Sequence, residues 1–152
     1  MSAAARTPAG RDGCVFCRIV AGEAVAHKVL EDEHTVAFLD HTPLFAGHTL
    51  VVPRHHVVTL DELALESISP LMATVQRLVA VMPEALGCQG TFVANNNVVS
   101  QSVPHLHVHV VPRTRGDGLR GFFWPRHPYA PGEAEAAAAR LRAALNGRAG
   151  GT

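Results

Sequence analysis

The chain has 152 residues, 47% of them hydrophobic, with thirteen basic and thirteen acidic residues. This length favours a single domain, and the balanced charge gives no reason to expect a nucleic acid or an anionic membrane as partner. No apolar run approaches the roughly 18 residues that a membrane span needs, and the N-terminus lacks the apolar core of a secretory signal. We therefore expect a cytoplasmic protein whose three cysteines form no disulfide framework.

The first half of the chain predicts short strands. Residues 1–12 are rich in Ala, Arg, Gly and Pro without periodicity, so we expect a disordered tail. Residues 28–39 predict two strands around a tight turn near Asp32, the second running from Thr35 to Leu39. A third strand is expected in residues 48–53.

A long amphipathic helix is expected next. Apolar residues recur at spacings of three and four after Ser69, which we interpret as the N-cap, with Pro70 in the first turn. Gly87 is the expected stop, and Pro83 is expected to bend the last turn.

Two further strands, residues 90–95 and 105–111, precede a C-terminal helix at about residues 133–145. Strands outnumber helices, so the long helix must cover one face of a sheet. The sequence predicts an α+β domain over residues 13–125, with a mostly antiparallel sheet, followed by a C-terminal extension over residues 126–152.

The segment "HLHVHVV" places His105, His107 and His109 at alternate positions. In a strand they would share one face, while Leu106 and Val108 face the core. A histidine-rich outer face is the plain interpretation. A metal site is a second, and acid, base or nucleophile chemistry by a neutral imidazole is a third. The preceding "NNNVVSQS" adds side-chain and backbone donors, a suitable lining for an anion.

These residues resemble the histidine triad family, most of all its Hint-like branch and bacterial relatives. The motif His-x-His-x-His with two apolar residues is complete, and "CVFCRIVAGE", "VLEDEHTVAFLD" and "GHTLVVPRHH" follow the family order. The similarity covers roughly residues 14–125. It implies the family's α+β fold and nucleotide chemistry.

The resemblance assigns roles residue by residue. His107 is implied as the nucleophile that attacks the α-phosphate of a nucleotide and forms a nucleotidyl-histidine, and His109 as the group that contacts the phosphate and helps the leaving group depart. Ser102 is also implied in catalysis, on the evidence of its place beside the phosphate. The implied nucleotide-binding residues are Asp40, which accepts the ribose hydroxyls, together with His41, Asn95, Asn96, Gln101, Ser102, His107 and His109.

The loop "NNNVVSQS" departs from the family pattern, because it is shorter and lacks the usual glycines. The departure leaves open which of Asn95, Asn96 and Asn97 faces the phosphate. His48 matches a family position near the active centre, with support of the sheet as the alternative interpretation.

Cys14 and Cys17 have the spacing of a zinc knuckle, although a redox pair or buried thiols show the same spacing. Bacterial relatives that carry this pair bind a structural zinc, which implies Cys14, Cys17, His56 and His105 as four ligands of a closed tetrahedral site. His55, beside His56, keeps the third ligand ambiguous by one residue.

The resemblance implies a homodimer, with Phe122, Phe123 and Trp124 near the active site and the dimer partner. The expected function is hydrolysis of a purine nucleoside phosphoramidate to release a nucleoside 5′-monophosphate such as AMP. A dinucleoside polyphosphate hydrolase or phosphorylase, a nucleotide sensor without turnover and a pure metal-binding module are the alternatives.

Overall fold

The computed structural model describes residues 11–119 and 126–149. The expected tail up to residue 10 and the aromatic row Phe122 to Trp124 lie outside the described residues. The chain divides into two compact units, residues 1–117 and residues 118–152. Among the described residues, no helix combines the length and the apolar character required to cross a bilayer.

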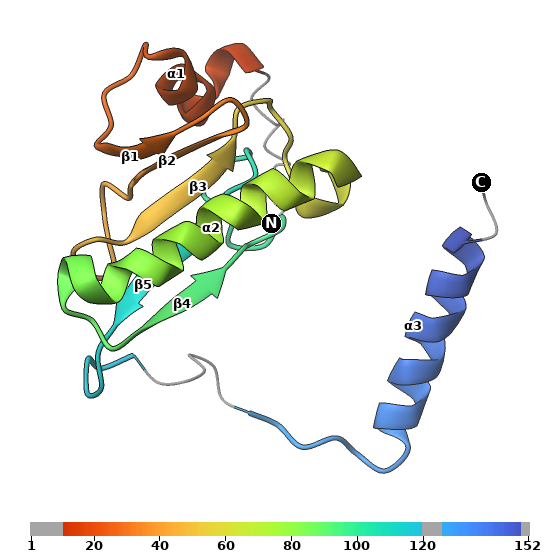
Figure 1. Ribbon diagram of the computed structural model, residues 1–152. Helices are drawn as coiled ribbons and strands as arrows, with labels where there is room; N and C mark the ends of the chain where they lie inside the picture. The colour runs from red at the N-terminus through yellow and green to blue at the C-terminus, as the bar shows by residue number, and fades with distance from the viewer. Residues whose placement is uncertain (1–10, 120–125, 150–152) are drawn as a thin grey trace, which may run out of the picture. The chain divides into compact units, whose positions relative to one another are not determined.

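The first unit contains a five-stranded antiparallel sheet with the strand order β1-β2-β3-β5-β4 (Figure 1). The strands are β1 (Lys28–Glu31), β2 (Thr35–Leu39), β3 (Thr49–Pro53), β4 (Gly90–Ala94) and β5 (Val108–Arg113). The turn between β1 and β2 is fixed by Asp32, whose carboxylate accepts hydrogen bonds from the backbone amides of His34 and Thr35. With the helices described below, this is the predicted α+β arrangement.

The long helix α2 (Leu65–Leu86) lies across one face of this sheet (Figure 1). It begins earlier than predicted, because Ala64 rather than Ser69 is the N-cap and Pro70 lies inside the helix. Ala64 provides no side-chain capping bond, so the polar signal at Ser69 misplaced the start. Gly87 ends the helix, as predicted, and it does so in the left-handed conformation.

A short helix α1 (Val15–Ala21) was not predicted. It follows the three-residue 3₁₀ helix η1 (Arg11–Gly13), and the sulfur of Cys14 caps it by accepting from the amide of Cys17 at 3.5 Å. Gly22, at φ 79°, ends it. A second 3₁₀ helix, η2 (Leu60–Glu62), precedes α2.

The core has two parts, one for each face of the sheet. The cluster with α2 includes Ala37, Val51, Leu71, Val75, Leu106, Val108 and Val110. The cluster with α1 includes Phe16, Ile19, Val36, Phe38, Leu50 and Val52. Residues adjacent in β2 and β3 thus enter different clusters, as the alternation of a strand requires.

The second unit contains α3 (Glu133–Ala149), which extends beyond the end expected at about residue 145. The carboxylate of Glu133 accepts a hydrogen bond from the amide of Ala130, and this bond satisfies a donor just before the helix.

Candidate functional site

The three histidines of the triad lie on the side of their segment away from the α2 core. The regular strand β5 starts only at Val108, so His105 and His107 precede the strand that was predicted to hold all three. The alternation is kept nevertheless. Leu106, Val108 and Val110 join the α2 cluster, whereas the rings of His105 and His107 both meet the edge or face of Phe16 from α1.

His107 is buried, and Nδ1 of its ring donates a hydrogen bond to the backbone carbonyl of His105 at 2.7 Å. Burial lowers the pKa of His107 below the ordinary value, which favours a neutral ring. A neutral imidazole carries one N–H, so the proton on Nδ1 leaves a lone pair on Nε2. His107 is therefore oriented and protonated as a nucleophile requires.

His109 lies next to His107, with ring centroids 5.0 Å apart. Its Nδ1 lies 2.9 Å from Nε2 of His48, which comes from the start of the β3 segment. Burial, followed by the nearby His107 and His48, lowers the pKa of His109 to about 4. The two rings of the candidate site are thus both neutral near pH 7.

Asp40 follows β2 and reaches the same site. Its carboxylate accepts a hydrogen bond from the amide of Thr42 at 3.0 Å, as a turn aspartate does. It also lies 3.8 Å from a ring nitrogen of His48 and 3.8 Å from one of His41. The side chain of His41 is 94% exposed, so it approaches Asp40 from solvent.

The three asparagines before the triad have different partners. Asn95 donates to the backbone carbonyl of His107 at 2.9 Å, which links it to the triad segment. Asn96 donates to the carbonyl of Ser100, and Asn97 accepts from the amide of Leu60. Among the three, Asn95 is the one bonded to the segment that carries the triad.

Gln101 was expected to line a phosphate, but its side chain holds its own loop. Its amide nitrogen donates to the carbonyl of Val58 at 2.6 Å, and its oxygen accepts from the amide of Val98. Val98 has φ 69° and Ser100 has φ 62°, so both are in the left-handed conformation, which is costly for the β-branched Val98. The bonds of Gln101 help to hold this strained loop. Ser102 is exposed beside it.

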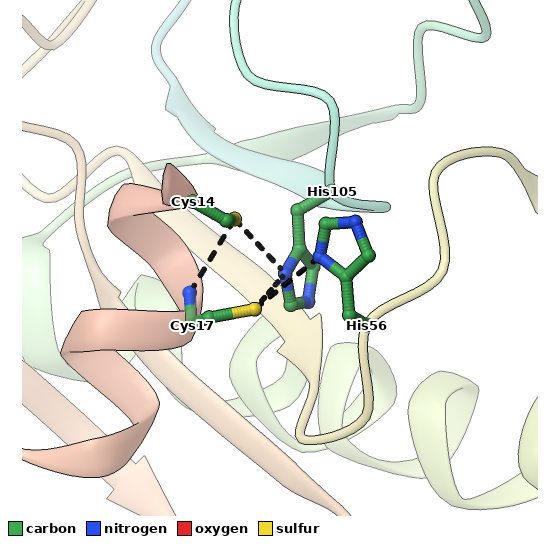
Figure 2. A group of neighbouring side chains, drawn as sticks. All are labelled: Cys14, Cys17, His56 and His105. Carbon is green, nitrogen blue, oxygen red and sulfur yellow. Dashed lines mark hydrogen bonds between the residues drawn. The ribbon is translucent and has the colours of Figure 1, made fainter. Parts of the chain in front are cut away.

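The second cluster joins Cys14, Cys17, His56 and His105, whose side chains point toward one another (Figure 2). Nδ1 of His105 lies 3.5 Å from both sulfurs, and Nδ1 of His56 lies 3.2 Å from the sulfur of Cys17. All four ligand atoms lie within 4.8 Å of one another. His55 is exposed and outside the cluster, so His56 is the one of these two neighbouring histidines that faces the cysteines.

The donor set of this cluster fits a metal ion. Two sulfurs and two imidazole nitrogens at these separations match a tetrahedral site. Nε2 of His105 donates to the carbonyl of Pro53 at 2.9 Å, which leaves the lone pair of Nδ1 facing the cysteines. The cluster could therefore hold a metal ion.

The comparisons with known proteins agree with this arrangement. The HIT domain family model matches residues 21–116, and the chain belongs to this family. It is 44% identical over 107 residues to an uncharacterised HIT-like protein of Methanocaldococcus jannaschii, a match that covers 69% of this chain and 82% of that protein. It is 31% identical over 125 residues to the adenosine 5′-monophosphoramidase of Schizosaccharomyces pombe, covering 81% of this chain and 91% of that protein.

Solved structures share the fold. A Zn-bound histidine triad family protein from Mycobacterium smegmatis superposes with a TM-score of 0.69 at 38% identity, covering 89% of this chain and 99% of that chain.

The lowered pKa of His109 predicts how stability depends on pH. The unfolded chain takes up a proton on this histidine near pH 6.5, whereas the folded protein takes it up only near pH 4. The free energy of unfolding should therefore fall as the pH falls from 6.5 to 4. Unfolding measured across this range should show a smaller pH slope in His109→Gln than in the wild type.

His34→Gln, which replaces an exposed histidine in the β1–β2 turn, controls for the loss of an imidazole as such. Equal slopes in His109→Gln and the wild type would contradict the lowered pKa.

Proposed function

We propose that the protein hydrolyses a purine nucleoside phosphoramidate and releases a nucleoside 5′-monophosphate such as AMP through a nucleotidyl-histidine intermediate. The observation that carries this proposal is the hydrogen bond from Nδ1 of His107 to the carbonyl of His105, which leaves the lone pair of Nε2 for attack on phosphorus. Three fungal relatives named adenosine 5′-monophosphoramidase support the same reaction class.

The other expected residues receive roles in this proposal. His109 contacts the phosphate and helps the leaving group depart, and Ser102 donates a hydrogen bond to a phosphate oxygen. Asp40 accepts the ribose hydroxyls, with His41 at the solvent side of the nucleoside pocket. Asn95 is favoured over Asn96 for a place beside the phosphate, because it is bonded to the carbonyl of His107. The amide of Gln101 is committed to Val58, so Gln101 acts by holding the loop that carries Ser102.

His107→Ala should lower turnover of adenosine 5′-phosphoramidate by about three orders of magnitude or more, because the attacking nitrogen is lost. AMP affinity should stay within about tenfold of the wild type, since the ribose and phosphate contacts remain. Steady-state kinetics and calorimetric titration with AMP measure the two quantities.

Wild-type turnover by His107→Ala would contradict the nucleophile. The same assay with a diadenosine polyphosphate tests the leaving group, and a faster reaction with that substrate would favour the dinucleotide hydrolase reading instead.

We also propose that Cys14, Cys17, His56 and His105 hold a zinc ion that stabilises the fold. The sulfur and nitrogen donors suit zinc, and the similar protein of Mycobacterium smegmatis is Zn-bound. Four protein ligands leave no open coordination position, so the ion would hold α1, the His56 loop and the triad segment together and would take no part in bond cleavage.

Protein purified without chelators should contain about one zinc per chain by elemental analysis. Replacing Cys14 and Cys17 by serine should remove the metal and lower Tm by about 5 °C or more, with a smaller effect on the rate per folded molecule. Cys88→Ser is the matched control, because Cys88 lies outside the cluster. Metal-free wild-type protein with the same Tm as the metal-loaded form would contradict the structural role.

We further propose a homodimer that uses the open edge of the sheet. Within the part of the chain that the structure describes, strand β4 pairs with a strand, β5, on one side only, and an apolar groove of about 360 Å³ lies between β4 and α2. Ile68, Met72 and Val93 line it and are 37–46% exposed, an exposure typical of an interface.

Met72→Glu should convert the dimer to a monomer, because it places a charge in this groove. Sedimentation velocity measures the change. Val81→Glu, on an exposed part of α2 outside the groove, should leave the dimer intact. A monomeric wild-type protein would contradict the proposal.

A further inference from the structure

His48 is buried between the backbone and the triad, and the sequence alone leaves its role open. The turn before β3 holds it firmly: its amide donates to the carbonyl of Phe45, and its carbonyl accepts from the amide of Asp40, both at 2.9 Å. Gly47, at φ 97°, permits this turn, and a β-carbon there would collide with Leu86. The ring of His48 is therefore placed by backbone bonds on both sides.

The hydrogen bonds of His48 determine which of its ring nitrogens carries the proton. Nδ1 receives the backbone N–H of Leu44 at 3.2 Å, so Nδ1 is an acceptor. Burial lowers the pKa of His48, which keeps the ring neutral. A neutral imidazole has one N–H, and it must then lie on Nε2.

The proton on Nε2 of His48 in turn determines the tautomer of His109 in the triad. Nε2 of His48 lies 2.9 Å from Nδ1 of His109, so the N–H of His48 donates to Nδ1 of His109. A neutral His109 that accepts at Nδ1 carries its own proton on Nε2. His107 has the opposite tautomer, with its proton on Nδ1 and the lone pair on Nε2.

We propose that His48 is a positioning residue that fixes the proton of His109 on Nε2, so that His109 presents an N–H donor to the phosphoryl group while His107 presents a lone pair. The effect on catalysis rests on the proposed function, whereas the tautomer of His109 follows from the hydrogen bonds alone. Without His48, Nδ1 of His109 loses its donor, and the ring is free to exchange tautomers or to turn its lone pair toward the substrate. A lone pair there would repel the phosphate oxygens.

Other charged and titratable groups surround this pair. The carboxylate of Asp40 lies 3.8 Å from Nδ1 of His48, too far for a hydrogen bond, and the ring of His107 contacts that of His109. Neither provides a donor to Nδ1 of His109. Among the residues that the structure describes, the Leu44 amide and His48 therefore set the tautomer of His109.

The direct test is the nitrogen NMR spectrum of the histidine side chains in the full-length protein. In the wild type, Nδ1 of His109 should have the shift of an unprotonated nitrogen and Nε2 that of a protonated one. In His48→Leu, the signals of His109 should move to a mixture of tautomers. In His48→Gln, the side-chain amide supplies an N–H near the position of Nε2, so the tautomer of His109 should be retained.

Kinetics on adenosine 5′-phosphoramidate provide the second measurement. His48→Leu should lower kcat by about tenfold or more with KM within about threefold, and His48→Gln should recover most of the loss. His34→Leu, at an exposed histidine, is the control for folding and activity.

Three results would overturn the proposal. They are a wild-type His109 protonated on Nδ1, an unchanged His109 tautomer in His48→Leu, and a His48→Leu variant whose kcat per folded molecule equals that of the wild type. If His48→Leu does not fold, the wild-type spectrum and His48→Gln still decide. If the wild type cleaves no phosphoramidate, the proposed function fails while the spectrum still tests the tautomer.

Discussion

The extended segment from His105 to Val110 must serve two surfaces at once, and the rest of the structure depends on this constraint. Its apolar residues Leu106, Val108 and Val110 are buried under α2, and their burial fixes the register of the segment. A shift by one residue would place imidazoles in the core, and it would remove His105 from the cysteines and His107 from the candidate site. The hydrophobic contacts that stabilise the sheet therefore also determine the face on which the three histidine side chains lie.

His105 connects the Cys14, Cys17 and His56 group to the site of His107. Its ring faces the cysteines through Nδ1 and is held by the carbonyl of Pro53 through Nε2. Its own backbone carbonyl accepts the hydrogen bond from Nδ1 of His107. Ring and carbonyl belong to the same residue, so the contacts of the ring of His105 hold the part of the chain that also supplies the acceptor of His107. The two histidines thus differ in their contacts. His105 is held by Pro53 and faces the cysteines, whereas His107 leaves the lone pair of Nε2 free of the bond that Nδ1 makes.

Much of this could be predicted from the sequence because it depends on local patterns. Alternation predicted which residues of the triad segment enter the core, and the spacing of apolar residues predicted α2 and its end at Gly87. The spacing of Cys14 and Cys17 indicated a ligand pair, and the structure brings both sulfurs to His56 and His105. The predicted start of α2 was wrong because the N-cap Ala64 has no side chain that signals a cap. Helix α1 was not predicted because its cap is a cysteine sulfur.

The remaining features depend on contacts between residues far apart in the chain. His48 and His109 meet only because the folded sheet brings their strands together. The hydrogen bond from the amide of Gln101 to the carbonyl of Val58, and the position of His55 outside the cluster, depend on how the loops fold. Hydrogen bonds of this kind also decide tautomers, which no spacing of residues can specify. Local periodicity therefore predicts the arrangement of the fold, whereas the proton positions of the site require the structure.

The central claim is that the lone pair of His107 attacks phosphorus, and a covalent intermediate tests it most directly. Wild-type protein mixed with adenosine 5′-phosphoramidate, quenched in base within one turnover and measured by intact and peptide mass, should carry one adenylyl group on His107. His107→Ala should carry none. An adenylyl group on another residue, or rapid turnover by His107→Ala, would contradict the account.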